Sequence, residues 1–184
     1  APLAERLRSG ALDLALVARI RRPADMDTEV LYEDHYVHAV RAGHPRAAEA
    51  LTLDSFCEVP QIFLGYGTSI LDDLIDDTLA RSGRSRVVQI AVTSFGQILH
   101  QLRHSDHAAV LPARVAHEHA DELCVRPLPF ALPTYLSLLC WSAPALADPG
   151  VRWLRDAVRA SVRAASGPGE PPPAVQPRPE RLAS

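Results

Sequence analysis

Residues 61–111 read QIFLGYGTSILDDLIDDTLARSGRSRVVQIAVTSFGQILHQLRHSDHAAVL, and their pattern decides the fold. Short apolar runs at 61–64, 87–92 and 108–111 have the length of buried strands. Between the first two runs, apolar residues recur at helical spacing: Ile70, Leu71, Leu74, Ile75 and Leu79. A second helical stripe follows the middle run: Phe95, Ile98, Leu99 and Leu102. Strands that alternate with helices predict an α/β fold with mainly parallel sheets.

The same alternation continues on both sides of this stretch. Further strands are expected at 12–17, 29–32, 36–40 and 135–141. Helices are expected at 2–9, at 53–57 behind a Thr52 cap, and after Asp148-Pro149. In the last helix we expect valines and Leu154 to face inward and the arginines at 152, 155, 159 and 163 to face solvent.

Length and composition are those of a globular α/β protein. The 184 residues allow one compact domain or two small lobes, and no apolar run is long enough to span a bilayer. The start of the chain carries no basic and apolar signal peptide. Residues 165–184 are rich in proline and poor in apolar side chains, which predicts a disordered tail.

Charge and cysteine usage exclude several functions. The net charge is −3, so the residues present are not expected to grip DNA themselves. Cys57, Cys124 and Cys140 are widely spaced, which argues against a disulfide framework or a zinc ribbon and favours a reducing cytoplasm. Cys140 is expected to be a small core residue.

Two strand-to-helix turns are candidate ligand sites. In the first, Gly65 and Gly67 let the backbone approach a ligand, and free amides at the helix start favour an anion; the contacts would come from Tyr66, Gly67, Thr68 and Ser69. The alternative is an ordinary turn capped by Thr68. In the second turn, Phe95 could pack against an aromatic ring while Thr93 or Ser94 donates hydrogen bonds. Alternatively, Phe95 only begins the apolar stripe of its helix.

Other chemistry finds little support in the sequence. His100 and His104 are four residues apart, but no HExxH glutamate accompanies them, so a solvated helix end is expected rather than a metal site. No G-x-S-x-G elbow is present, and Asp72, Asp73, Asp76 and Asp77 fit a solvated helix face. We therefore expect no catalytic residue, no cofactor and no metal.

The order of the motifs resembles the effector domain of LysR-type transcriptional regulators. LRSGALDLAL (7–16), EVLYEDHYVHAVRAGHP (29–45) and the 61–111 stretch occur in the family's order. CWSAPALADPGVRWLRDAV (140–158) is similar to the subgroup that responds to aromatic acids. The resemblance covers about residues 1–164.

This resemblance implies a type 2 periplasmic-binding-protein-like fold with a small-molecule effector held between two lobes. Lobe I would comprise residues 1–35 and 136–164, and lobe II residues 36–135. Lobe I is expected to be incomplete, because family members carry a strand, a helix and a second strand before the LRSG motif. The two turns would face the effector cleft, and His35, near the hinge, is a further candidate contact.

The resemblance also implies the partners of the intact protein. A family member would form a homo-oligomer in the cytoplasm, with no membrane contact, and would bind DNA only through an N-terminal domain missing from this chain. Two alternatives remain open at this point. A transporter's solute-binding protein shares the fold, and so does a small α/β enzyme such as a dehydratase.

Overall fold

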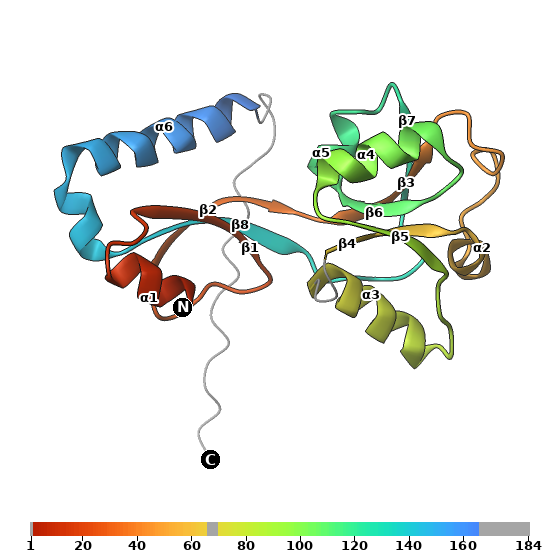
Figure 1. The fold of residues 1–184 in the computed structure, drawn as a ribbon, viewed down its shortest axis with the longest axis horizontal. Helices are drawn as coiled ribbons and strands as arrows, with labels where there is room; N and C mark the ends of the chain where they lie inside the picture. Colours follow the sequence, from red (N-terminus) through yellow and green to blue (C-terminus); the bar gives the residue numbers. More distant parts are fainter. Residues whose placement is uncertain (1, 66–69, 166–184) are drawn as a thin grey trace, which may run out of the picture. The chain divides into compact units, whose positions relative to one another are not determined.

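The computed structural model describes residues 2–65 and 70–165 and divides the chain into two compact units (Figure 1). The first unit comprises Ala1–Glu33 and Tyr135–Ser184, and the second comprises Asp34–Thr134. Of the tail expected at 165–184, Ala165 is instead the last residue of a helix, and residues 166–184, like the turn residues 66–69, lie outside the described residues.

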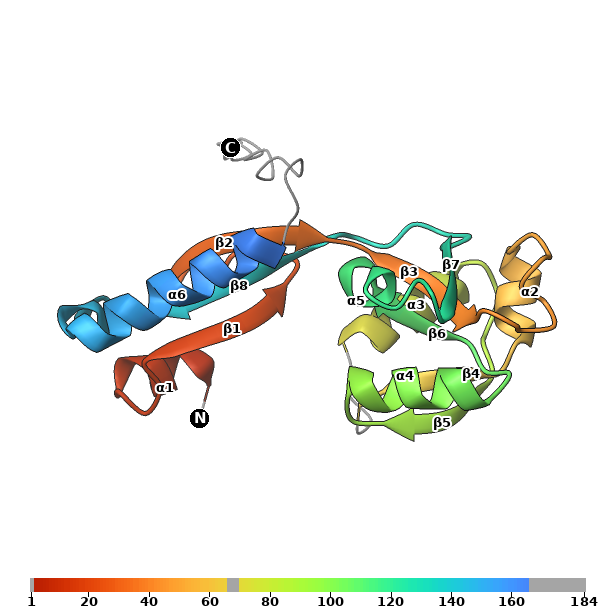
Figure 2. The same cartoon turned by 90° about the horizontal axis from the view of Figure 1, so that it is seen from above.

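The first unit is a three-stranded sheet with helices packed against it (Figure 2). Its elements are α1 (Leu3–Arg8), β1 (Leu14–Arg19), β2 (Asp27–Asp34), β8 (Tyr135–Trp141), the 3₁₀ helix η1 (Ala143–Ala147) and α6 (Pro149–Ala165). The strand order is β1-β8-β2, and β1 runs antiparallel to β8. The core on one face joins Leu7 of α1 to Leu138 and Cys140, so the expectation of a buried Cys140 is confirmed.

Helix α6 has its expected orientation only in part: its valines are half-buried and Arg152 and Arg163 are exposed, as expected, but three other residues differ. Leu154 is 45% exposed, and no residue of the helix is buried. Two arginines expected in solvent are instead half-buried: the Arg155 guanidinium lies 5.8 Å from the Trp141 ring centroid, and Arg159 Nε lies 2.8 Å from Glu29 Oε1. Because long arginine stems cover apolar surface while their charges find partners, the arginine side of an amphipathic helix can also pack against a sheet.

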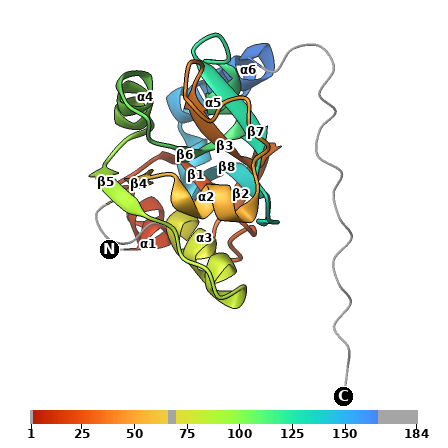
Figure 3. The same ribbon diagram turned by 90° about the vertical axis from the view of Figure 1, so that its right-hand side faces the viewer.

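The second unit contains the strand-helix alternation that the sequence predicts. Its elements are β3 (Tyr36–Arg41), α2 (Leu53–Glu58), β4 (Gln61–Leu64), α3 (Ile70–Arg81), β5 (Val88–Val92), α4 (Phe95–His104), β6 (Ala109–Pro112), α5 (Ala113–His117) and β7 (Leu123–Pro127). Figure 3 shows α4 and α5 on one side of the strands and α3 on the other. Strand β7 was not expected from the sequence.

The expectation of mainly parallel sheets is wrong for several neighbours. Strands β4 and β5 pair parallel, and an isolated parallel bridge between Gln61 and Ala108 joins β4 to the residue before β6. Strand β3, however, lies between β6 and β7 and is antiparallel to both, and β1 is antiparallel to β8. In the second unit, strands β4, β5 and β6 run in the same direction and are connected through α3 and α4. Strand β7 runs in the same direction as β6 and is connected to it through α5.

The core of the second unit occupies both faces of its strands. On one face, Ile98, Leu99 and Leu102 of α4 pack against strand residues such as Ile62 and Leu111. On the other, Leu71, Ile75 and Leu79 of α3 pack with Phe56 of α2 and Val110 of β6. Within the part of the chain that the structure describes, no helix is long and apolar enough to cross a membrane.

The acidic face of α3 is not wholly solvated, which corrects a second expectation. Asp72 is only 3% exposed, and its carboxylate accepts a 2.7 Å hydrogen bond from Arg86 Nη2. Arg86 also donates from Nε to Asp76 Oδ1 over 2.8 Å. The buried cation neutralises the acid, so a carboxylate can occupy the inner side of this helix.

Candidate functional site

The strand order of the second unit brings three strand-to-helix turns to one edge. Strands β4 and β5 are parallel, and the Gly65 amide after β4 donates 2.7 Å to the Val92 carbonyl at the end of β5. Strand β6 follows β4 in the same direction, and Tyr36 at the start of antiparallel β3 pairs with Pro112 at its end. We call this the carboxyl edge: Gly65, Thr93–Phe95, Pro112–Arg114 and Asp34–Tyr36. In open α/β sheets, ligands bind at such edges.

Gly65 opens the first candidate turn in a conformation that requires glycine. Its φ is 127°, a region that side-chain-bearing residues rarely adopt. Tyr66, Gly67, Thr68 and Ser69 lie outside the described residues, so their expected effector contacts stay a prediction.

The second candidate turn is capped by its own polar side chains. Ser94 is the N-cap of α4, and its hydroxyl oxygen accepts from the Gln97 amide over 3.3 Å. Thr93 donates from its amide and its hydroxyl to Gln97 Oε1, over 2.8 and 3.1 Å. Both residues are exposed, and no acceptor for the Ser94 hydroxyl proton occurs among residues 2–65 and 70–165. Ser94 can therefore donate to a ligand while it caps the helix.

The position of Phe95 is compatible with both of its interpretations, as an effector contact and as the start of an apolar stripe. It is half-buried and packs against the cluster formed with Ile98 and Leu99, so it does begin the apolar stripe of α4. Contact with an effector stays a prediction.

His35 lies at the carboxyl edge beside a buried acid that sequence reasoning did not single out. Asp34 is 5% exposed and accepts from the His35 amide over 2.7 Å and from the Arg114 amide over 3.3 Å. Its carboxylate thus joins the start of β3 to the first turn of α5. The His35 side chain remains 62% exposed, with Nδ1 3.7 Å from Asp34 Oδ1. The sequence gives no signal that Asp34 is buried, because one of its partners, the Arg114 amide, is 80 residues away.

A groove of about 360 Å³ adjoins His35 in the second unit. Its lining includes His35, Tyr36, His117, Leu128 and Phe130, which combine polar tips with apolar surface. Burial, with a smaller effect of the Asp34 charge, raises the pKa of Tyr36 to about 12, so its hydroxyl stays protonated at neutral pH. A cavity of this size and mixed lining is typical of small-molecule sites.

The histidines of α4 form a pair rather than a cluster. The ring centroids of His100 and His104 are 4.7 Å apart, and both residues are exposed. His107 lies apart from them in hydrogen bonds with Ser105 and Gln89. Among the described residues no group of three or more potential ligands could hold a metal ion.

The sequence is similar to known proteins of one family. The model of the LysR substrate binding domain matches residues 1–163. The HTH-type transcriptional activator NahR of Pseudomonas putida is 29% identical over 161 residues, which cover 83% of this chain and 51% of NahR. The chain spans about half the length of the curated relatives it matches.

Solved structures show the same fold. The regulatory domain of MexT, a transcriptional activator in Pseudomonas aeruginosa, has a TM-score of 0.65 at 24% identity, over 86% of this chain and 76% of that domain. The effector binding domain of QuiR in complex with shikimate has a TM-score of 0.63 at 18% identity, over 87% and 76%. The two-unit α/β architecture is thus the periplasmic-binding-protein-like fold of regulatory domains, as expected.

The chain belongs to the LysR substrate-binding-domain family. The family and the matched relatives are transcriptional regulators and not enzymes, which agrees with the prediction that this chain has no catalytic role. Neither the aromatic-acid subgroup nor the individual effector contacts follow from these matches.

Proposed function

We propose that this chain is the sensing domain of a LysR-type transcriptional regulator and binds a small aromatic or carboxylate effector at the carboxyl edge. The observation that carries the proposal is the exposed Ser94 hydroxyl, a free donor at an edge that also presents the Gly65 turn and the His35 ring. The effector binding domain of QuiR, which has the same fold, is in complex with shikimate, a ring compound with a carboxylate.

The edge has the chemistry that such a ligand needs. The hydroxyl of Ser94 and amides of the 65–69 segment would donate to a carboxylate, with Tyr66, Gly67, Thr68 and Ser69 as its surroundings. His35 would donate from the other side. The half-buried ring of Phe95 offers an apolar face beside Ser94 and Thr93 on which a ligand ring could lie.

In the intact regulator, effector binding would shift the population of domain arrangements and so change DNA contacts. DNA binding would reside in a segment outside this chain, because NahR, an HTH-type activator, extends to about twice the matched length. We also propose that the intact regulator forms a homo-oligomer and lies in the cytoplasm without contacting a membrane.

A ligand screen tests the effector class. The full-length regulator is heated with benzoate, salicylate, shikimate and matched neutral analogues such as benzamide, and its melting temperature is recorded. We expect at least one carboxylate to raise the melting temperature while its neutral analogue does not. Stabilisation by other metabolite classes alone, for example sugars or amino acids, would contradict the proposal.

A matched pair of cap variants tests the location. Ser94→Asp keeps an N-cap acceptor for the Gln97 amide but places a negative charge at the carboxyl edge. Thr52→Asp makes the same kind of change at the N-cap of α2, before β4 rather than after it. We expect Ser94→Asp to weaken carboxylate binding at least tenfold and Thr52→Asp to leave it within twofold. Equal affinities in the two variants would move the site elsewhere.

A further inference from the structure

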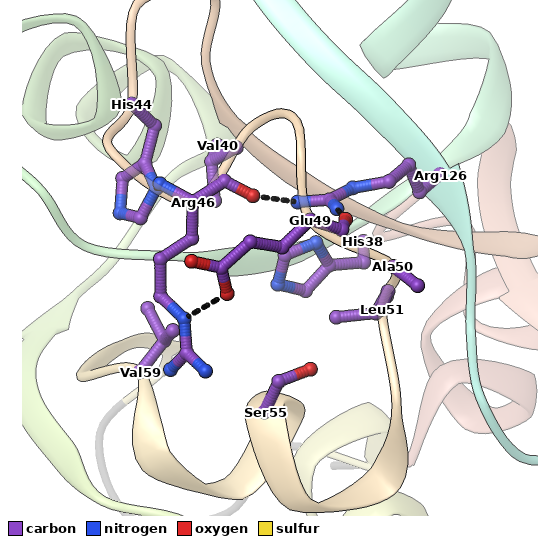
Figure 4. Close-up of a pocket in the computed structure, with 10 residues that line it drawn as sticks. All are labelled: His38, Val40, His44, Arg46, Glu49, Ala50, Leu51, Ser55, Val59 and Arg126. Atoms are coloured by element: carbon purple, nitrogen blue, oxygen red, sulfur yellow. Dashed lines mark hydrogen bonds and ion pairs between the residues drawn. The ribbon is translucent and has the colours of Figure 1, made fainter.

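A second, much smaller cavity lies between β3, β7 and the segment that leads to α2 (Figure 4). About 10 Å³ of it is open to a water-sized sphere, which is close to the space needed by one water molecule. His38 and Arg126 line it from the strands, and Glu49, Leu51 and Ser55 are among the residues that close it. It is distinct from the carboxyl edge and shares none of the predicted effector contacts.

His38 faces this cavity with unsatisfied polar atoms. Its side chain lies on β3 and is 1% exposed, with its ring centroid 5.8 Å from that of Phe56. Within the part of the chain that the structure describes, neither Nδ1 nor Nε2 has a hydrogen-bond partner. Because buried polar atoms without a hydrogen-bond partner destabilise the folded state, the two ring nitrogens need a partner.

Arg126 supplies a third unsatisfied atom at the same place. His38 and Arg126 are register partners on β3 and β7, so their side chains emerge side by side on one face. The two terminal nitrogens of Arg126 donate to the carbonyls of Glu49 and Arg46. Its Nε is buried and, among the described residues, has no acceptor.

The chemistry of these atoms defines what can fill the cavity. Arginine Nε–H only donates, so the ligand must accept from it; toward the neutral His38 imidazole, the ligand can either accept from the ring N–H or donate to the bare nitrogen. A halide can only accept. An anion is also disfavoured because Glu49, whose carboxylate accepts from Arg46 Nε over 2.8 Å, lines the cavity. An ammonium ion cannot accept at all. Water meets both requirements and matches the size.

We propose that this cavity binds one structural water molecule, which accepts from Arg126 Nε and joins it to the His38 ring. The water links two strands directly, and through the Arg126 contacts to Arg46 and Glu49 it holds the 46–49 segment against the sheet. The water thus supplies a partner for Arg126 Nε and for one of the two buried His38 ring nitrogens.

A high-resolution crystal structure of the chain grown in sodium bromide tests the proposal. We expect a solvent peak within hydrogen-bond distance of both Arg126 Nε and a His38 ring nitrogen, without bromide anomalous signal. A bromide peak there would show an anion site and overturn the proposal. So would an empty cavity, or a His38 ring bonded directly to a protein group.

Solution NMR gives an independent readout. A water nuclear Overhauser effect at the Arg126 Nε–H is expected in the original chain and in His38→Gln, which keeps a donor and an acceptor. The signal should be lost in His38→Leu. If His38→Leu does not fold, the first two proteins still decide, because absence of the signal in the original chain refutes the water.

Discussion

Arg86 Nη2 and Asp72 Oδ1 are 2.7 Å apart, and their side chains are 1% and 4% exposed. Asp72 lies in the first turn of α3, and its Oδ2 accepts from the amide of Leu64, the last residue of β4, over 3.3 Å. Burial alone would lower the pKa of Arg86, but hydrogen bonds to Asp76 and Asp72 outweigh it and raise the pKa. The pair therefore joins the start of α3 to the strand that leads into the carboxyl edge.

Removing the buried cation should strongly destabilise the second unit. Arg86→Met leaves Asp72 buried without its charge partner, and we expect the free energy of unfolding to fall by about 3–5 kcal/mol in urea titrations. Arg84→Met is the matched control, because the Arg84–Asp54 pair is 47% and 60% exposed. It should cost less than about 1 kcal/mol. Equal losses in the two variants would mean that the buried pair has no special role.

Acidification should unfold the protein partly through His38. Burial first, then the charges of Arg126 and His44, lower the pKa of His38 to about 3. Between pH 6.5 and 3 the unfolded chain therefore binds a proton that the folded chain does not, so stability is complete above about pH 7 and falls as the pH drops. From pH 7 to pH 4 this site should remove about 3 kcal/mol.

The comparison of urea midpoints between pH 7 and pH 4 measures this effect. His38→Gln cannot titrate, so its free energy of unfolding should depend less steeply on pH than that of the original chain. His100→Gln, at an exposed position on α4, serves as the control and should keep the original slope. Parallel pH profiles for the original chain and His38→Gln would contradict the account.

Thiol labelling should separate the three cysteines. Burial raises the pKa of the Cys57 and Cys140 thiols, which lie in the cores of the second and first units. Cys124 is only half-buried, and all three are free. In native conditions iodoacetamide should label Cys124 first, and Cys57 and Cys140 only on unfolding. Fast labelling of Cys140, followed by mass spectrometry of peptides, would show that the core of the first unit opens readily.

The cap of α2 gives a local test of helix stability. The Thr52 hydroxyl oxygen accepts from the Ser55 amide, and the Ser55 hydroxyl oxygen accepts from the Thr52 amide. Thr52→Ala should reduce the free energy of unfolding by about 1 kcal/mol, while Thr52→Asp should keep most of it. Thermal unfolding compares the two; a larger loss in Thr52→Asp would disqualify it as the control for Ser94→Asp.

Much of the architecture was readable because its signals are local. Helical stripes such as Ile98–Leu99–Leu102, the Thr52 cap and the apolar run ending at Trp141 all fold as their periodicity and end signals predict. Strand direction could not be predicted from the sequence. The apolar runs of β3 and β4 are alike, and the direction of each strand depends on the path by which the chain returns to the sheet. Strand β7 was missed because LCVRP is short and half-buried and ends in proline.

From the sequence, only the strand-to-helix turns of the candidate site could be predicted. Ser94 is a candidate because hydroxyls at a strand-to-helix turn have a local signature, and His35 is one only through the family resemblance; both stay predictions as effector contacts. Asp34, Asp72 and Arg86 could not be found in this way, because a buried charge is tolerated only through a partner distant in the chain, such as Arg86 for Asp72 fourteen residues away. His38 was hidden by an alternating strand pattern that equally fits a surface histidine.

The most direct test of effector binding at the carboxyl edge is a crystal structure of the regulator soaked with the most stabilising carboxylate of the screen. We expect the carboxylate within hydrogen-bond distance of Ser94 Oγ and of the 65–69 segment, with the ligand's ring near Phe95 or the His35 side chain. A ligand found only in the hollow of the first unit lined by Leu7, Met26 and Trp141 would contradict the account.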